Sequence, residues 1–274
     1  MGAVMVEVMS VMTSSRGVGE LLRDWRQRRR LSQLDLAVEA DVSARLHEAE
    51  VTGRSKPSRE LLLHLAEHLD VPLRERNSFL LAAGFAPLYP ESALDTDRME
   101  PVREALGKIL TGHEPFPAVI VDRHWDLVSA NRPALAVMGR SASPELLTPP
   151  VNALRISLHP DGLAPHIVNL SEYSAHLLTR LHRQVILSGD DKLAALYDEL
   201  RRYPGVSLSS TAVDTASLLF VPFVLRGADG EQLSFFSTLA TFGTALDITV
   251  AELAIESFFP AEKATETALR NQFG

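Results

Sequence analysis

The segment "RRRLSQLDLAVEADVSARL", residues 28–46, decides the N-terminal fold. Ser32, with Asp35 three residues later, forms a capping box, so we expect a helix to begin directly after Ser32. The residues expected to face inward from this helix are Leu34, Ala37 and Val38. The short "DVS" stretch allows only a tight turn before Ser43 caps the next helix. Two short helices joined in this way are typical of a helix-turn-helix.

The flanking segments predict further short helices around this pair. Upstream, apolar residues at helical spacing indicate one buried face, formed by Val18, Leu21, Leu22 and Trp25. Downstream, Ser58 is expected to cap the helix "RELLLHLAEHL", and the helix in "DVPLRERNSFLLAAG" ends at Gly84. The arginine run within residues 26–30 fits either a solvated helix end or a phosphate-binding edge. The sequence therefore predicts an all-α domain of five helices over residues 16–86.

A possible metal motif lies in the fourth of these helices. "HLAEH", residues 64–68, matches the pattern of one metallopeptidase class, in which two histidines one turn apart bind zinc and the glutamate acts as base. The leucines of this helix, however, predict a buried face that leaves His64, Glu67 and His68 on the polar side. No neighbouring carboxylate has a plausible spacing for a third ligand. We interpret the motif as a solvated helix face and expect no metal, no cofactor and no enzymatic activity.

The rest of the chain predicts a mixed α/β domain. A linker over residues 87–100, rich in turn formers and charges, separates it from the helices. "PAVIVDRHWDLVSAN" predicts two strands around a short turn, and Asn131 is expected to cap the following helix. A long helix face then runs from Ile167 to Val185, before Gly189 ends the helix.

The residues after this helix change from helical to strand periodicity. Three strands are expected, in "VSLSSTAV", "ASLLFVPFVLR" and "EQLSFFSTLATF", and "GADG" joins the last two as a hairpin. The closing stretch, residues 247–273, is expected to be helical throughout. Early strands, intervening helices and a late hairpin predict an α/β sheet with one covered face over residues 101–274. With the N-terminal helices, the fold class is α+β.

Composition and charge limit the functions that are open to the chain. The sequence has 274 residues and no cysteine, which excludes disulfides, thiolate metal sites and a cysteine nucleophile. Residues 16–59 carry ten Lys and Arg against seven Asp and Glu, whereas residues 91–274 carry fifteen against twenty-three. Only the N-terminal part is therefore expected to meet a polyanion. Because the apolar residues 1–12 resemble neither a secretory signal nor a membrane helix, we expect a cytoplasmic protein without membrane contact.

The N-terminal motifs closely resemble a known family. "RRRLSQLDLAVEADVSARL" followed by "TGRSKPSRELLLHLAEHLDVPLRERNSFLLAAGFAPLY" is similar to the XRE-type helix-turn-helix of MmyB-like bacterial transcriptional regulators. The resemblance implies double-stranded DNA as partner, with Gln33 clamping the backbone. It implies major-groove contacts from Ser43, Ala44 and Arg45, and phosphate contacts from Arg54 and Lys56. Arginine suits these roles because it reads guanine bidentately and pairs with phosphate.

The expected third helix departs from the family pattern within residues 46–51. The family places apolar residues at the positions of His47 and Glu50, whereas this chain has Leu46 and Ala49 instead. This shift turns the apolar stripe by about 100° around a helix. Either the helix rolls to bury Leu46 and Ala49, or His47 and Glu50 point at the core. The domain then either binds DNA with an altered sequence preference or has weakened or lost DNA binding. If DNA binding is weakened or lost, the chain is a ligand-sensing or protein-interaction module.

The C-terminal part resembles the sensor of the same family. The matching phrases are "VDRHWDLVSAN", "LHPDGLAPHIVN", "FFSTLATFGT" and "DITVAELAIESFFPAEKA". The resemblance implies a PAS-like ligand-binding domain, a homodimer, and a small, lipid-like ligand such as a fatty acid. The side chains expected at the ligand are Trp125, Asn131, Arg155, Phe220 and Phe235. Arg155, in an otherwise apolar helix, suits either a ligand carboxylate or an internal acid. The predicted function is a ligand-responsive, sequence-specific transcriptional regulator.

Overall fold

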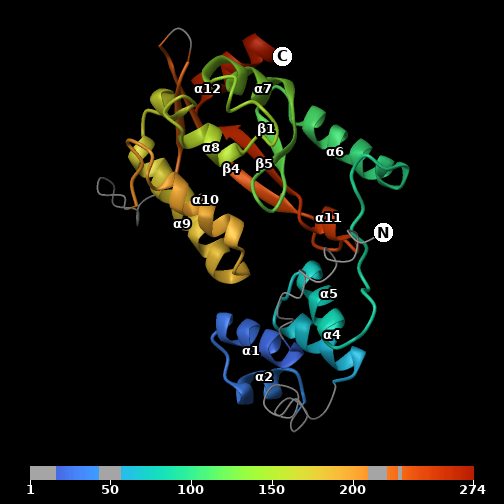
Figure 1. Ribbon diagram of the computed structural model, residues 1–274. Helices are drawn as coiled ribbons and strands as arrows, with labels where there is room; N and C mark the ends of the chain where they lie inside the picture. Colours follow the sequence, from blue (N-terminus) through green and yellow to red (C-terminus); the bar gives the residue numbers. More distant parts are fainter. Residues whose placement is uncertain (1–16, 43–56, 209–220, 228–229) are drawn as a thin grey trace, which may run out of the picture. The chain divides into compact units, whose positions relative to one another are not determined.

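The computed structural model describes residues 17–42, 57–208, 221–227 and 230–274 (Figure 1). The chain divides into two compact units. One unit contains residues 1–91 together with Leu246–Ile248, and the other contains Ser92–Ala245 and Thr249–Gly274. Each unit has its own hydrophobic core. No helix in the described part of the chain is long and apolar enough to cross a membrane.

The described part of the N-terminal unit is helical, as the sequence predicts. Its helices are α1 (Val18–Arg28), α2 (Gln33–Glu39), α4 (Arg59–His68) and α5 (Leu73–Ala82). The expected third helix, which contains Ser43, Ala44 and Arg45, lies outside the described residues. The buried core of the unit includes Leu22, Trp25, Leu36, Leu62, Leu65, Leu69 and Phe79. The core thus joins the apolar faces of all four described helices.

Helix α2 begins where the capping box predicts but buries a different face. The Ser32 hydroxyl accepts a hydrogen bond from the Asp35 amide at 3.1 Å, and the Asp35 carboxylate accepts one from the Ser32 amide at 2.8 Å. Leu36 and Ala37 are buried. The expectation that Leu34 and Val38 face inward is wrong, since they are 73% and 72% exposed. In a helix of only seven residues, Leu36 and Ala37 supply the contact with the core.

The C-terminal unit is built on a five-stranded antiparallel sheet. Its strands are β1 (Ala118–Val121), β2 (Leu127–Ala130), β3 (Phe223–Arg226), β4 (Gln232–Thr241) and β5 (Ala254–Pro260). Their order across the sheet is β2-β1-β5-β4-β3. The two predicted hairpins are confirmed, because β1 pairs with β2 and β3 pairs with β4. The central strand β5 joins them, with Val119 and Leu239 on either side of Glu256.

Helices pack on both faces of this sheet. They are α6 (Glu100–Gly112), α7 (Arg132–Ser141), α8 (Ala153–Leu158), α9 (Leu170–Ser188), α10 (Asp191–Leu200) and α12 (Lys263–Phe273), with short turns η2 (Asp97–Met99) and η3 (Ala164–His166). The short helix α11 (Ile248–Ala251) precedes β5 in the chain. Val119 and Val121 point to the larger core, which α7 to α10 and α12 share. Ala118 and Ile120 point to a smaller core with Leu106 of α6. This alternation follows from the two-residue period of a strand. Figure 1 shows α6 and the α8–α10 group on opposite sides of the sheet.

The predicted C-terminal end of the long helix and the predicted cap of α7 are confirmed. Ile167, expected on the face of the long helix, lies before it, because α9 begins at Leu170. Asn131 caps α7, since its side-chain oxygen accepts a hydrogen bond from the Ala134 amide at 3.2 Å. Gly189 ends α9 in the left-handed conformation, with φ of 65°. The expectation of a wholly helical residue 247–273 stretch is wrong, because β5 interrupts it. The backbone of β5 pairs with β1, which lies far earlier in the sequence, and with β4, which is the strand before it.

Candidate functional site

Of the residues expected to contact DNA, the structure describes only Gln33. Gln33, the residue expected to clamp the DNA backbone, is the first residue of α2 and is partly buried. The other expected DNA-binding residues, Ser43, Ala44, Arg45, Arg54 and Lys56, lie outside the described residues. The capped amino terminus of α2 fixes the direction in which Gln33 leaves the helix.

Arginines of the run at the end of α1 connect helices to one another. The Arg29 guanidinium donates to the carbonyl oxygens of Leu69 and Asp70 at 2.8 Å each, and it stacks over Trp25. Arg26 is 9% exposed and donates to the Leu31 carbonyl at 2.8 Å. These two arginines therefore hold the bundle together, because each satisfies carbonyls beyond a helix end.

The HLAEH motif has no third ligand in the described structure. His64 Nε2 lies 2.7 Å from the carbonyl oxygen of Ala40, and the rings of His64 and His68 pack edge to face with their centroids 4.6 Å apart. No group of three metal-ligating side chains occurs among the residues that the structure describes. The contact with Ala40 gives His64 a packing role between α2 and α4.

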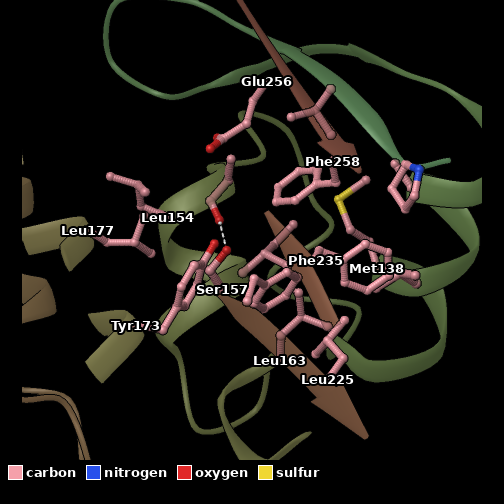
Figure 2. A pocket seen from close by; sticks show the side chains of 17 residues that line it. Met138, Leu154, Ser157, Leu163, Tyr173, Leu177, Leu225, Phe235, Glu256 and Phe258 are labelled. Carbon is pink, nitrogen blue, oxygen red and sulfur yellow. Dashed lines mark hydrogen bonds between the residues drawn. The ribbon is translucent and has the colours of Figure 1, made fainter. Parts of the chain in front are cut away.

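An apolar cavity of about 70 Å³ lies between the sheet and the helices of the C-terminal unit (Figure 2). Its walls come from β1, β3, β4, β5 and helices α7, α8 and α9. The lining residues are Pro117, Val119, Ala134, Val137, Met138, Ala153, Leu154, Ile156, Ser157, Leu163, Tyr173, Leu177, Phe223, Leu225, Phe235, Glu256 and Phe258. Small-molecule sites combine such an apolar wall with a few placed polar groups.

Three of the lining residues carry polar side chains. Glu256 on β5 is 6% exposed, and its Oε1 accepts hydrogen bonds from Arg180 Nη1 at 3.2 Å and Ser237 Oγ at 3.1 Å. Tyr173 on α9 is 5% exposed, and burial, with the nearby Glu256 charge, raises the pKa of its hydroxyl. The Ser157 hydroxyl donates to a carbonyl within α8. The cavity wall therefore holds one carboxylate and one neutral phenol.

Of the residues expected at a ligand, Phe235 lines the cavity. Trp125 is buried beside it, but its indole N–H donates to Gln184 at 2.8 Å and its ring lies under the Arg180 guanidinium at 4.3 Å. Asn131 is buried and bonded to the backbone, accepting from the Ala118 amide and donating to the Phe116 carbonyl. Phe220 lies outside the described residues. The structure therefore brings one of the expected side chains to the cavity wall.

Arg155 lies in a second, polar hollow of about 260 Å³. Its Nε and Nη2 donate to the two carboxylate oxygens of Glu199 at 2.8 Å each, which is the internal-acid alternative left open by the sequence. Tyr203 donates to the same carboxylate. The bond from Arg155 lowers the pKa of Glu199, and the Tyr203 bond contributes in the same direction against the effect of burial. Arg155 is not among the residues that line the apolar cavity.

Sequence reasoning missed Glu256 and Tyr173. Glu256 was missed because the stretch around it was expected to be helical, where a glutamate is an ordinary surface residue. The aromatic pair Phe258 and Phe259 directly after it was the available signal for a strand. Tyr173 was not among the residues expected to face inward from the long helix, and its position in the sequence gives no sign of the cavity. Both residues can be recognised as cavity-lining only in the folded structure, where β5 and α9 form parts of the same wall.

Comparisons with known proteins identify the family. The family model of the MmyB-like transcription regulator ligand binding domain matches residues 102–271, which is more than half of the chain. The chain belongs to the MmyB-like transcription regulators. A helix-turn-helix domain model matches residues 18–79 of this regulator. Neither matched family is an enzyme family, and the confirmed architecture is a helix-turn-helix region followed by an α/β ligand-binding domain.

Two solved structures similar to this MmyB-like regulator have low structural agreement with it. An RsLOV variant is 16% identical, with coverage of 61% of this chain and 75% of its own, and has a TM-score of 0.28. An RNA-binding light-oxygen-voltage receptor is 13% identical, and the match covers 95% of this chain and 62% of the receptor chain, with the same TM-score of 0.28. No curated protein matches the regulator. The family assignment therefore rests on the two domain models.

Proposed function

We propose that this MmyB-like regulator binds specific double-stranded DNA sequences and that a small, lipid-like ligand in the apolar cavity controls this binding. The observation that supports the proposal most is the cavity itself, which lies inside the matched ligand-binding domain and has an almost wholly apolar wall. The domains of the proposal span residues 16–86 for an XRE-type helix-turn-helix, 87–100 for a linker and 101–274 for a PAS-like sensor. A sheet with a cavity under its helices supports the PAS-like assignment.

The DNA-binding residues of the proposal are Gln33, Ser43, Ala44, Arg45, Arg54 and Lys56. Gln33, at the start of the capped helix α2, suits a contact with a backbone phosphate. The basic N-terminal part and the acidic remainder of the chain support a polyanion at the helix-turn-helix alone. Such a regulator works as a homodimer on paired half-sites and acts in the cytoplasm, where bacterial DNA lies.

A fatty acid is the example of the lipid-like ligand that the sequence predicts. Phe235, which was expected at the ligand, lines the cavity. Arg155, by contrast, would have to break its bonds to Glu199 before it could bind a ligand carboxylate.

A substitution that fills the cavity tests whether the ligand binds there. Ala153→Leu adds bulk to the wall and should abolish stabilisation by any acyl compound, whereas Ala105→Leu on the exposed surface of α6 should not. Equal stabilisation of both variants would place the ligand elsewhere.

The second candidate function is a sensor or protein-interaction module with weakened DNA binding. The unusual residues 46–51 favour it, because they shift the apolar stripe of the expected recognition helix. A gel shift of the full chain with DNA from upstream of its own gene separates the two functions. A retarded complex that unlabelled specific DNA competes away better than random DNA supports the regulator. Equal competition by both DNAs, or no complex, supports the second function.

A further inference from the structure

If the cavity binds a lipid-like ligand, as proposed above, the acidic side chain of Glu256 in its wall limits which head groups that ligand can carry. Glu256 is the only charged residue among the lining side chains that the structure describes. It projects from the central strand β5, next to Phe258, toward the α9 side of the sheet, and Figure 2 shows its carboxylate turned into the cavity. A buried carboxylate is costly unless it is paired and hydrogen-bonded. Its partners therefore decide what a ligand meets there.

Only one of the two oxygens of the Glu256 carboxylate accepts hydrogen bonds from side chains in the described part of the chain. Arg180 and Ser237 both donate to Oε1. In the described part of the chain both of these donors bond to Oε1, and Oε2 is left to face the cavity. Arg180 is not among the lining residues; its guanidinium lies 4.3 Å from the Trp125 ring, and its Nη2 is buried without a hydrogen-bond partner in the described part of the chain. A ligand entering the cavity thus meets an acceptor oxygen whose negative charge Arg180 already offsets through Oε1.

Tyr173 supplies the complementary group. Its ring stacks on Phe223 with the centroids 4.6 Å apart, which fixes the side chain beside the cavity. Tyr173 is 5% exposed and lines the cavity, and within the described part of the chain its hydroxyl is left for a group in that cavity. Burial and the Glu256 charge raise the pKa of this hydroxyl, so that it remains a neutral donor and acceptor. An unmade hydrogen bond at a buried hydroxyl is costly, and a polar ligand group removes that cost.

The charge balance disfavours an ionised ligand of either sign. A carboxylate would bring a second negative charge next to Glu256 in an apolar cavity, where like charges disfavour each other. An ammonium group gains little, because Arg180 already neutralises Glu256 at 3.2 Å. Both ions would also lose their hydration. A hydroxyl loses less, since it can donate to Glu256 and accept from Tyr173 at once.

We propose that Glu256 and Tyr173 select a lipid-like ligand with a neutral, hydrogen-bond-donating head group of the alcohol type, and discriminate against the matching carboxylic acid. The apolar tail lies along Phe235, Met138 and Leu225. Unpaired polar groups are effective at rejecting a ligand that cannot satisfy them.

The test compares octanol, octanoic acid and octylamine as probes in thermal melts of the full chain near neutral pH, with dissociation constants taken from the dose dependence. We expect octanol to stabilise the wild-type protein at lower concentration than the acid and the amine. Tyr173→Phe should weaken octanol binding by roughly tenfold, the effect of one lost hydrogen bond. Glu256→Gln should reduce the preference for octanol over octanoic acid. Glu266→Gln, on the exposed surface of α12, is the matched control and should leave the preference unchanged.

The outcomes separate this inference from the proposed function. If octanoic acid binds the wild-type protein as tightly as octanol or tighter, the selection by Glu256 is wrong and the lipid-like ligand stands. If none of the three probes shifts the melt, the lipid-like ligand itself is wrong. If Glu256→Gln does not fold, the Tyr173→Phe comparison still decides, because unchanged octanol affinity in that variant overturns the role of Tyr173.

Discussion

Arg155 and Glu199 form a two-point ion pair that is about one third exposed on each side. Sequence alone could not choose between this pair and a ligand carboxylate, because the two residues are 44 positions apart. Arg155→Met should lower the free energy of unfolding by about 1 kcal/mol, which is modest because solvent screens the pair. It should leave stabilisation by octanoic acid and by octanol equally unaffected in the thermal melt. A selective loss of the response to the acid would instead assign Arg155 to the ligand.

Glu199 should contribute a pH-dependent part of the stability. Its pKa lies below the ordinary glutamate value of 4.5, mainly because Arg155 bonds to the carboxylate. A lowered pKa in the folded state means that the unfolded state takes up protons first, so the stabilisation is present above pH 4.5 and is lost as the pH falls below it. Glu199→Gln should therefore flatten the decline of the melting temperature in acid, whereas Asp198→Asn, with its exposed side chain, should not. Parallel acid profiles for the wild type and Glu199→Gln would show that the pair does not titrate in this way.

At the scale of elements, glycine at two helix positions should have opposite effects on stability. Gly189 ends α9 with φ of 65°, a conformation that costs other residues about 1 kcal/mol. Gly139 lies within α7, where an added Cβ meets no atom within 4 Å. Gly189→Ala should therefore destabilise the protein, and Gly139→Ala should stabilise it by up to about 1 kcal/mol because alanine is the better helix former. Chemical denaturation of both variants checks the pair, and a stabilising Gly189→Ala would refute the assigned helix end.

The sequence predicts the elements whose signals are local. The Ser32 capping box, the turn-flanked β1–β2 and β3–β4 hairpins and the Gly189 helix end are all short-range features, and all are found. Strand β5 was missed because its stability comes from pairing with β1, more than 130 positions earlier in the chain, and with β4. The aromatic residues of the late hairpin, Phe223 and Phe235, predict an apolar cavity, but Glu256 and Tyr173 meet there only through that same long-range pairing. Local patterns cannot show such a meeting.

At the scale of the whole molecule, the uneven charge predicts how DNA binding depends on salt. Arg54→Ala and Lys56→Ala should each weaken binding to all sequences about equally and flatten the salt slope by about one unit. Arg29→Met should leave the slope unchanged, because Arg29 is bonded to the carbonyls of Leu69 and Asp70. Arg45→Ala should instead relax the preference at one base position, at a cost of roughly 1–3 kcal/mol at the best site. Fluorescence anisotropy over a range of salt concentrations distinguishes these classes. Uniform weakening by Arg45→Ala would refute its role as a base reader.

We propose that a ligand in the apolar cavity and DNA at the helix-turn-helix are coupled within this one chain. Coupling between two sites is a free energy, so a ligand that changes DNA affinity must itself bind with altered affinity when DNA is present. The cavity-filling variant Ala153→Leu should block the proposed ligand site, because Ala153 lines the cavity, and it leaves the helix-turn-helix sequence unchanged.

The most direct test is the affinity of the full chain for DNA from upstream of its own gene, measured by fluorescence anisotropy with and without saturating octanol. We predict sequence-specific binding whose dissociation constant changes by about fivefold or more when octanol is added, as expected for a typical coupling free energy. Ala153→Leu should bind the same DNA without any response to octanol. An affinity for DNA that octanol leaves unchanged in the wild-type protein, under conditions where octanol raises its melting temperature, would contradict the account.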